Sequence, residues 1–466
     1  MRTIISSRIK VYDCSIELYH WAHDNLTIVN PTWQKLMQLG KEDTIARKNI
    51  PEKMKLFAEY NGGRDLSLPF GVLHAVWPFI CKSEYEVKLN DNGMVIDTDM
   101  PISMPLYPYQ EKAVWEMLRA RGGILEGSCG CGKTQMGIEI AKKLGRNTLW
   151  LCHTGDLLTQ TVKRIKQLYP NMPVGTITEG SVNMVTNGIT VSTVQTLVNV
   201  EPDLYRKAFD TVITDECHHV SGSPTLSKMH ISILDKIAAR NKFGLSATLT
   251  RADTLIKSMY AYVGCNIKGE FAPVTKIEKE QTKTLTAKHI RVDLSTPFSY
   301  ETVDESGMLD YPAMIEFLSN NEKRNQDIVD NVIKTLEKHS KQLVLCQRIE
   351  QCKTLHQMLT DKGIKSVILV GKVTKKQRDA ILAGTKDWNV IVATMALAKE
   401  GLDVPELSCL HWAIPVSDKV ATIQSAGRVE RVFEGKPEPE IYDYVDVNYP
   451  YCLGKWKKRV SFLRKR

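Results

Sequence analysis

One stretch of the sequence has the residue types and the spacing of a phosphate-binding loop. Its fixed positions match G-x-x-x-x-G-K-[ST] without a mismatch. A short apolar run over 122–126 precedes the loop, and 135–144 carries apolar residues at helical spacing, so strand, loop and helix follow in the required order. Backbone N–H groups and the helix N-terminus would surround phosphate oxygens. The loop consists of Gly127, Ser128, Cys129, Gly130, Cys131, Gly132, Lys133 and Thr134.

Two pairs of residues supply the remaining chemistry of ATP hydrolysis. Lys133 can reach the β- and γ-phosphates, and the Thr134 hydroxyl can ligate Mg²⁺. Asp215 and Glu216 directly follow the apolar run 211–214, about 80 residues after the loop. We assign Asp215 to the metal, directly or through water, and Glu216 to the attacking water. In isolation, Asp-Glu after a strand means little; after a phosphate loop in an α/β domain it predicts an ATPase.

Two further segments belong to the same half of the chain. In 106–110 the Gln110 amide could read the adenine edge, and Tyr107 could stack on the ring. The alternative for Gln110 is an ordinary turn residue. The tripeptide 246–248, Ser-Ala-Thr, ends another apolar run, where its hydroxyls could hydrogen-bond near Asp215.

The second half has no phosphate loop but carries paired arginines. Arg428 and Arg431 lie three residues apart, one helical turn, and could both face a phosphate. Exposed helical arginines are usually just solvated. Because the first half lacks an arginine finger, a γ-phosphate arginine supplied across a cleft between two domains would complete the site. Thr394, Gly401 and Asp403 follow a predicted strand in the same half.

The last twelve residues hold seven basic side chains and no acidic one. Phosphate contacts from such a segment would give affinity for nucleic acid without sequence information. The alternative is a disordered, solubilising tail. The basic residues that we expect to contact DNA are Lys455, Lys457, Lys458 and Arg459.

Alternating strands and helices must position these residues. The runs 148–152, 189–192, 211–214 and 243–246 predict buried strands in the first half, and 342–346, 366–370, 389–393 and 410–414 predict them in the second. This alternation indicates an α/β fold with parallel sheets and flanking helices. We expect a small α+β accessory domain over 1–103, an ATP-binding domain over 104–272, a linker over 273–322, and a second α/β domain with the basic tail over 323–466.

The composition narrows the protein class. The 466 residues include 62 Lys and Arg against 53 Asp and Glu, a net charge of +9 that weakly favours a polyanionic partner. The eleven cysteines contain no C-x-x-C pair, which argues against structural zinc and suits a reducing compartment. We find no signal-peptide core and no apolar run of membrane-spanning length. We therefore expect a soluble, cytoplasmic protein without a membrane partner.

Taken in order, these motifs resemble those of superfamily 2 helicases over about residues 104–450. Gln110 matches the Q-type motif, 127–134 motif I, 215–218 the D-E-x-H box, 246–248 motif III, 394–403 motif V and 424–431 motif VI. The chain looks most like the branch that includes UvsW, XPB and the poxvirus transcript-release helicase, and especially like compact phage helicases that remodel branched DNA. Two residues depart from the pattern: His153 replaces the proline usual in motif Ia, and Gln424 replaces the histidine common in DEAD-box proteins.

The resemblance implies two RecA-like domains with ATP and Mg²⁺ bound between them and nucleic acid across their tops. It adds Gln424 to Lys133, Glu216, Arg428 and Arg431 as catalytic residues. It adds Asp403 to the ATP contacts. It also implies that DNA is contacted by Thr154, Thr193, Gln195 and Thr394.

The expected function is an ATP-dependent DNA helicase or translocase that tracks one strand and acts on forked or branched DNA in replication, recombination or repair. We expect a monomer that could work beside other replication or recombination proteins. One alternative is a translocase that displaces RNA or a transcription complex. Another is a nucleic-acid-binding scaffold with weak ATPase activity, against which the intact Lys133, Asp215 and Glu216 argue.

The N-terminal hundred residues carry no motif that names an activity. Their tryptophans, Trp21, Trp33 and Trp77, are more often core residues than stacking platforms. Because motor domains mainly contact the nucleic-acid backbone, we expect this region to recognise the branch. A chain starting near Met104 should then keep its single-strand-stimulated ATPase activity and lose unwinding of forks.

Overall fold

The computed structural model describes residues 1–464 except 129, 222–223, 248–255, 283–284, 372–379, 381–386, 396–403 and 416–417. These residues form two compact units. Met1–Ser128 and Gly132–Gln281 make up the first, and Thr282–Arg466 make up most of the second. No helix within the described ranges is long and apolar enough to cross a lipid bilayer.

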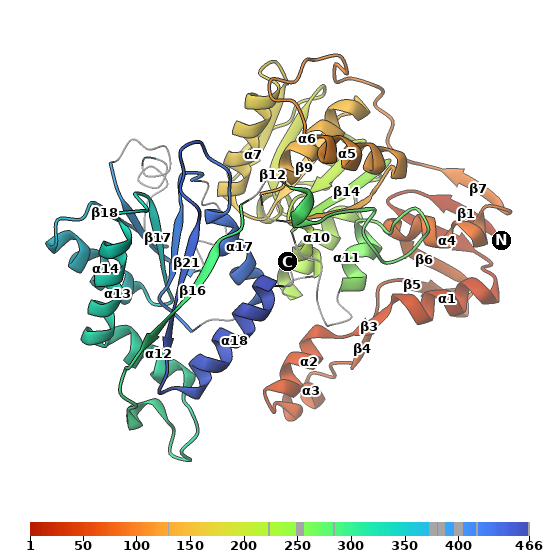
Figure 1. Cartoon of the computed structure of the whole chain (residues 1–466). Helices are drawn as coiled ribbons and strands as arrows, with labels where there is room; N and C mark the ends of the chain where they lie inside the picture. The colour runs from red at the N-terminus through yellow and green to blue at the C-terminus, as the bar shows by residue number, and fades with distance from the viewer. Residues whose placement is uncertain are drawn as a thin grey trace. The chain divides into compact units, whose positions relative to one another are not determined.

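The first unit begins with a five-stranded sheet in the order β5-β6-β2-β1-β7, antiparallel except for the pair β1–β7 (Figure 1). Along β2, Ile9 and Val11 are buried and Lys10 and Tyr12 are exposed, as expected of a strand with one face on a core. The elements are β1 (Arg2–Ile5), β2 (Arg8–Tyr12), α1 (Ile16–Leu26), β3 (Thr27–Val29), α2 (Pro31–Gln38), α3 (Glu42–Arg47), β4 (Lys53–Lys55), β5 (Ala58–Tyr60), β6 (Asp65–Pro69), α4 (Leu73–Ile80) and β7 (Glu84–Val87).

An eight-stranded sheet follows in the order β11-β10-β12-β9-β13-β14-β8-β15, parallel except for the pair β10–β11. Its central strands are almost continuously buried because helices cover both faces. The elements are α5 (Pro108–Ala120), β8 (Gly123–Gly127), α6 (Lys133–Leu144), β9 (Thr148–Cys152), α7 (Gly155–Leu168), β10 (Val174–Thr178), β11 (Ser181–Asn183), β12 (Ile189–Thr193), α8 (Val194–Leu197), α9 (Pro202–Tyr205), β13 (Thr211–Thr214), α10 (Pro224–Leu234), β14 (Asn241–Ser246), α11 (Ile256–Tyr262) and β15 (Thr275–Ile277).

Five neighbouring strands of this sheet bring the predicted motifs to one edge. The strands are adjacent in the order β12-β9-β13-β14-β8 and all run parallel. Their carboxyl ends therefore lie at the same edge of the sheet, where ligands of open α/β sheets bind. The residues at this edge are Thr193, His153, Asp215, Ser246 and Gly127.

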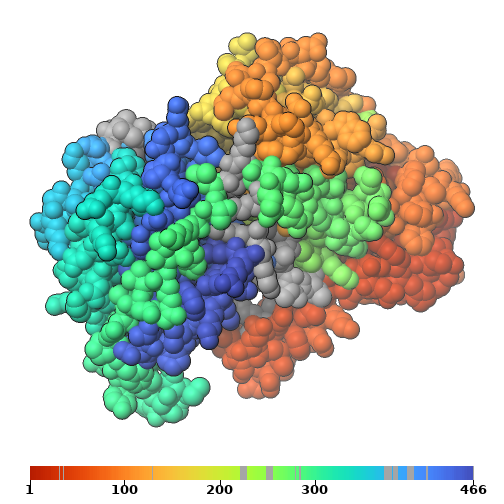
Figure 2. Space-filling view, viewed as in Figure 1, coloured from red at the N-terminus to blue at the C-terminus, as the bar shows by residue number. Residues whose placement is uncertain are grey.

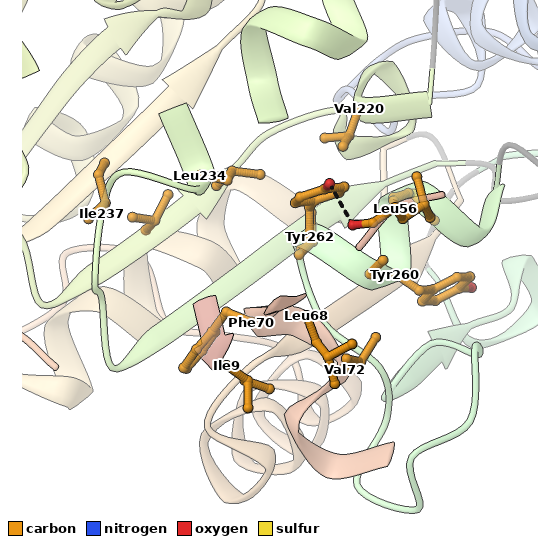
Figure 3. Packing of buried hydrophobic residues seen from close by; sticks show 14 of the residues in the cluster. Ile9, Leu56, Leu68, Phe70, Val72, Val220, Leu234, Ile237, Tyr260 and Tyr262 are labelled. Carbon is orange, nitrogen blue, oxygen red and sulfur yellow. Dashed lines mark hydrogen bonds between the residues drawn. The ribbon is translucent and has the colours of Figure 1, made fainter. Parts of the chain in front are cut away.

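The N-terminal sheet and the eight-stranded sheet share one hydrophobic core. Figure 3 shows Ile9, Leu68, Phe70 and Val72 packed with Leu234, Ile237, Tyr260 and Tyr262. The Tyr262 hydroxyl donates a hydrogen bond of 3.2 Å to the Leu56 carbonyl. At the right of Figure 2 the N-terminal residues (red to orange) lie directly against later residues of the first unit (green). Residues 1–103 are therefore packed as an integral part of the first unit.

A partly buried ion pair crosses the same junction. Arg8 of β2 donates to the Asp235 carboxylate at 2.7 Å. Within the part that contains the eight-stranded sheet, Lys242 of β14 donates to the Leu234 carbonyl at 2.6 Å. Burial lowers the pKa of Lys242 to about 7. A truncation at Met104 would expose this core and leave Asp235 without its arginine, which argues against a folded, active chain starting there.

We expect Arg8→Met to lower the free energy of unfolding by about 1–3 kcal/mol, because it leaves the poorly solvated Asp235 carboxylate without its cationic partner. Urea denaturation measures this loss. Arg2→Met is the matched control, since Arg2 pairs with Glu86 at 3.6 Å on the surface and should cost less than about 0.5 kcal/mol. Equal losses of unfolding free energy for the two variants would show that the Arg8–Asp235 pair does not stabilise the packing of the N-terminal sheet on the rest of the first unit.

The second unit is built on a six-stranded, wholly parallel sheet in the order β16-β21-β20-β17-β19-β18. Val344 and Val392 face a core with α13 and α14, whereas Leu343 and Ile391 face a core with α17. The elements are β16 (Lys288–Leu294), α12 (Tyr311–Asn320), α13 (Glu322–Thr335), β17 (Gln342–Cys346), α14 (Ile349–Asp361), β18 (Ser366–Leu369), β19 (Val390–Thr394), β20 (Cys409–Trp412), α17 (Lys419–Val429), β21 (Glu440–Asp446) and α18 (Pro450–Arg464).

The α/β fold class with two parallel sheets is confirmed. The structure differs in detail within the predicted linker 273–322. There β15 joins the eight-stranded sheet of the first unit, and β16 and α12 belong to the second unit. Because β16 is an edge strand in which only Leu294 is buried, its sequence lacks the apolar pattern of a buried strand.

Candidate active site

The phosphate loop leaves the end of β8 and enters α6 through Gly132. This glycine has φ = +87°, and a Cβ atom there would lie 2.2 Å from the Gln110 Nε2 atom. Only glycine fits both the backbone conformation and the close approach. Farther along α6, a Cβ at Gly137 would lie 2.7 Å from the Trp150 ring, so this glycine lets the helix pack closely on the sheet.

The Lys133 side chain contacts the backbone of the phosphate loop to which it belongs. Its Nζ atom donates to the carbonyl oxygens of Gly127 at 2.9 Å and of Ser128 at 3.4 Å. These hydrogen bonds hold the ammonium group at the mouth of the loop. Thr134 follows in the first turn of α6, and Cys131 is fully buried. The loop thus collects a cation, a hydroxyl and a helix N-terminus in one place.

The Gln110 amide ties the start of α5 to this loop. Its Oε1 atom accepts a 3.0 Å hydrogen bond from the Tyr107 backbone N–H, and its side chain is 2% exposed. Tyr107 is 43% exposed and stacks on Tyr109 with ring centroids 5.8 Å apart. The tyrosine is therefore available to a planar ligand. Adenine recognition by Gln110 and Tyr107 remains a prediction.

Asp215 and Glu216 form a carboxylate pair at the end of β13. Burial raises the pKa of Asp215 to about 7, and the negative charge of Glu216 adds to the rise. Burial would also raise the pKa of Glu216, but the His218 hydrogen bond and the Lys133 charge outweigh it and lower that pKa. The backbone N–H of Glu216 donates to Asp215 Oδ1 at 2.9 Å. Two adjacent carboxylates, of which Asp215 is buried and Glu216 half-buried, favour a bound cation, which would stabilise both charges.

His218 connects this pair to the end of β14. Its Nδ1 atom lies 3.3 Å from Glu216 Oε2 and 3.1 Å from Ser246 Oγ. Ser246 therefore hydrogen-bonds the residue beside the carboxylates, in the neighbourhood that the sequence predicted. Thr248 of the same tripeptide lies outside the described residues.

These residues fit a magnesium nucleotide. The Ser128 Oγ atom is buried in the loop without a hydrogen-bond partner among the described residues, as a group awaiting a ligand would be. Mg²⁺ is usually held by one or two protein oxygens together with phosphate oxygens and water. Thr134 and Asp215 would supply those protein oxygens, and Lys133 would neutralise phosphate charge. Cys129 lies outside the described residues and Gly130 is a described loop residue with φ = +85°.

The second unit carries the predicted arginines on and after α17. Gln424 and Arg428 lie on the helix, each 9% exposed, and Arg431 follows it. The Arg431 carbonyl accepts a 2.7 Å hydrogen bond from Lys436 Nζ, and burial lowers the pKa of Lys436 to about 8. The backbone that carries Arg431 is therefore anchored. Asp403 lies outside the described residues, and Thr394 is buried at the end of β19.

The predicted DNA contacts of the first unit lie together beyond β9 and β12. Thr154 Oγ1 caps α7 by accepting from the Leu157 N–H at 3.3 Å, and Thr193 Oγ1 accepts from the Thr196 N–H at 3.2 Å. Gln195 is exposed, and its Nε2 atom donates to the His153 carbonyl at 3.0 Å. Sequence reasoning gave no site role to His153 or to His219. The adjacent histidines after Asp215-Glu-Cys were the available signal.

One predicted DNA contact has to be corrected. Arg459 is 2% exposed, and its Nε atom donates to Asp443 Oδ2 at 2.9 Å. The basic segment is not a free tail over the described residues, because α18 extends to Arg464 and turns Arg459 inward. Lys455 is half-buried, with Nζ 4.7 Å from the Tyr451 ring centroid. Only Lys457 and Lys458 of the four predicted residues are exposed.

Deleting the residues from Lys455 onward would remove the buried Arg459 and destabilise the second unit. Charge reversal at the exposed lysines is therefore the better test of DNA binding by α18. Lys457→Glu/Lys458→Glu should weaken DNA binding on every sequence and reduce the slope of log K against log[salt] by up to about 1.8. A binding titration at several salt concentrations measures the slope. Lys334→Glu/Lys353→Glu makes the same charge change on α13 and α14 and is the control. Identical slopes for both variants would show that α18 does not contact DNA.

Comparison with known proteins identifies helicase relatives. Residues 103–251 match the family described as type III restriction enzyme, res subunit, and residues 324–433 match the helicase conserved C-terminal domain. Together the two matches cover more than half of the chain. A solved structure, Dbp5 of S. cerevisiae bound to RNA and ADP BeF3, matches 78% of this chain and 88% of its own with a TM-score of 0.56 and 15% identity, which supports the fold alone.

Three curated relatives have similar sequences. A protein of Escherichia phage T5 named as a helicase is 28% identical over 331 residues, 69% of this chain and 67% of its own length. A protein of Acanthamoeba polyphaga mimivirus named as an ATP-dependent RNA helicase is 26% identical over 378 residues, which are 79% of this chain and 69% of its own length. The ATP-dependent DNA helicase uvsW of Enterobacteria phage T4 is 27% identical over 266 residues, which are 55% of this chain and 50% of its own length.

Proposed function

Because this chain belongs to the superfamily 2 helicases, we propose that it couples the hydrolysis of magnesium ATP to movement along DNA and to the remodelling of forked or branched DNA. Helicase activity driven by a nucleotide follows from the family. The choice of DNA, the branched substrate and the use of Mg²⁺ are the parts that we propose.

The observation that carries the proposal is the convergence of motifs at one sheet edge. Five adjacent parallel strands end beside the phosphate loop, the carboxylate pair and the predicted strand contacts. ATP hydrolysis and strand binding can then influence each other over a short distance. Lys133 and the helix N-terminus would bind phosphate, Glu216 would orient and deprotonate water, and Asp215 with Thr134 would hold the metal.

One relative supports DNA as the substrate, and the packing of the N-terminal sheet supports a branched substrate. The phage relative named as a DNA helicase supports DNA, although the mimiviral relative is named as an RNA helicase. The N-terminal sheet is joined to the first parallel sheet through a common core, so any junction contact made by 1–103 would move with the ATP-binding part of the chain. If residues 1–103 bind the branch point, their rigid attachment to the ATP-binding part would allow each ATP-driven step along DNA to separate the strands.

Steady-state ATPase measurements with a matched panel of nucleic acids test the proposal. Single-stranded DNA, linear duplex DNA, forked DNA, a four-way DNA junction and single-stranded RNA are added at equal nucleotide concentration. We expect strong stimulation by the DNA substrates and more by forks and junctions than by linear duplex. Stimulation by RNA alone would replace DNA with RNA as the substrate, and an absence of stimulation by every substrate would support a binding scaffold.

A further inference from the structure

Three imidazole rings stack in series beside the carboxylate pair of the first unit. The ring centroids of His153 and His219 are 3.9 Å apart, and those of His219 and His218 are 4.3 Å apart. The successive ring planes are inclined by 33° and 35°. His153 follows β9, whereas His218 and His219 follow β13, the neighbouring strand. The stack therefore bridges the ends of two adjacent strands.

One end of the histidine stack touches the hydrolysis site. His218 Nδ1 lies 3.3 Å from Glu216 Oε2, the residue assigned to water activation. Glu216 has φ = +45°, in the left-handed region that non-glycine residues seldom adopt. Such a conformation persists only when its surroundings hold it. The position of the Glu216 carboxylate therefore depends on the groups that pack against it.

The other end of the stack lies among the predicted strand contacts. Gln195 Nε2 donates to the His153 carbonyl at 3.0 Å, and Thr154, the next residue, caps α7. Displacement of Gln195 or Thr154 on binding a nucleic-acid strand would act directly on the backbone of His153. The contacts from Gln195 through His153, His219 and His218 to Glu216 are thus continuous.

The middle of the stack is a neutral ring. Burial, together with His218 and His153, lowers the pKa of His219 to about 2, so this imidazole carries no charge at physiological pH. A neutral ring at this spacing interacts with its neighbours through ring packing, which fixes its orientation. The stack is therefore suited to transmit position, and an aromatic ring without nitrogen should perform the same role at His153.

We propose that His153 and His219 are positioning residues that hold His218 against Glu216 and that couple strand binding to ATP hydrolysis. This inference rests on the proposed function, because it requires ATPase activity that nucleic acid stimulates. It goes beyond the motifs, since motif Ia usually has proline where His153 stands, and proline has no aromatic ring to pack on His219.

The test compares ring-keeping with ring-removing substitutions of similar size. His153→Phe keeps an aromatic ring, and His153→Leu fills the space without one; His219→Leu and the double leucine variant complete the set. Steady-state ATPase kinetics are measured with and without a single-stranded DNA oligonucleotide. His20→Ala, at an exposed histidine of the same unit, is the control.

We expect His153→Leu and His219→Leu to lower the DNA-stimulated kcat about 10-fold, within the range typical of coupling between sites, with little change in the KM for ATP. His153→Phe should keep most of the stimulation. The double leucine variant should be no worse than either single one, because both break the same series of contacts. Melting temperatures establish that each variant is folded.

Three results would overturn the inference: full stimulation in both leucine variants, equal loss in His153→Phe and His153→Leu, or multiplicative losses in the double variant. Each of these leaves the wild-type stimulation intact and so leaves the proposed function standing. A wild-type chain that DNA does not stimulate would instead contradict the proposed function itself.

Discussion

Replacing Glu216 with glutamine is expected to abolish ATP turnover while ATP still binds. Glutamine keeps the size of the side chain and loses the carboxylate that activates water. General-base catalysis contributes roughly 10²–10⁴-fold, so kcat should fall by at least about 10²-fold. Phosphate release measures turnover, and equilibrium titration with a fluorescent ATP analogue measures binding. Turnover near the wild-type rate would remove Glu216 as the water-activating base.

Two further variants separate this effect from a general loss of structure. Lys133→Ala should also stop hydrolysis, and it should weaken nucleotide binding because it removes the charge at the β- and γ-phosphates. Glu179→Gln changes an exposed glutamate of the same unit and should leave both quantities unchanged. The contrast between Glu216 and Lys133 therefore distinguishes water activation from phosphate binding.

Arg431→Ala is expected to lower kcat by about 10³-fold or more if Arg431 acts as an arginine finger on the γ-phosphate. ATP affinity should change much less, since the finger acts mainly on the charge that develops during phosphoryl transfer. Rapid-quench measurement of a single turnover isolates this step from product release.

The control is Arg348→Ala, at an exposed arginine of the same unit that is the N-cap residue of α14. It should behave like the wild type. An Arg431→Ala variant with normal DNA-stimulated hydrolysis would make Arg431 an ordinary surface residue. A loss confined to ATP affinity would make it a ground-state contact instead.

The buried strands were the part of the fold that the sequence predicted best. The bounds of β9, β13 and β17 agree with the predicted runs because each is short, apolar and covered on both faces. The loops at the ends of β8 and β13 were also found, since glycine spacing and paired carboxylates are local signals. The roles of the residues in those loops remain predictions.

Features that depend on tertiary packing could not be read from local patterns. Arg459 belongs to a basic run, but a strand more than ten residues away provides Asp443 and turns the side chain inward. The histidine stack joins His153 and His219, which are 66 positions apart in the numbering, through the pairing of β9 with β13. The core that the N-terminal sheet shares with the eight-stranded sheet was not predicted, because no local pattern indicates that Phe70 packs in one cluster with Tyr260.

The most direct test of the central claim is a strand-separation measurement on a four-way DNA junction with labelled arms, with magnesium ATP and with a non-hydrolysable analogue. We predict that the wild-type chain converts the junction to forked products only with ATP, and that Glu216→Gln produces none. An intact junction in the presence of ATP, with RNA strands displaced from duplexes under the same conditions, would contradict the account.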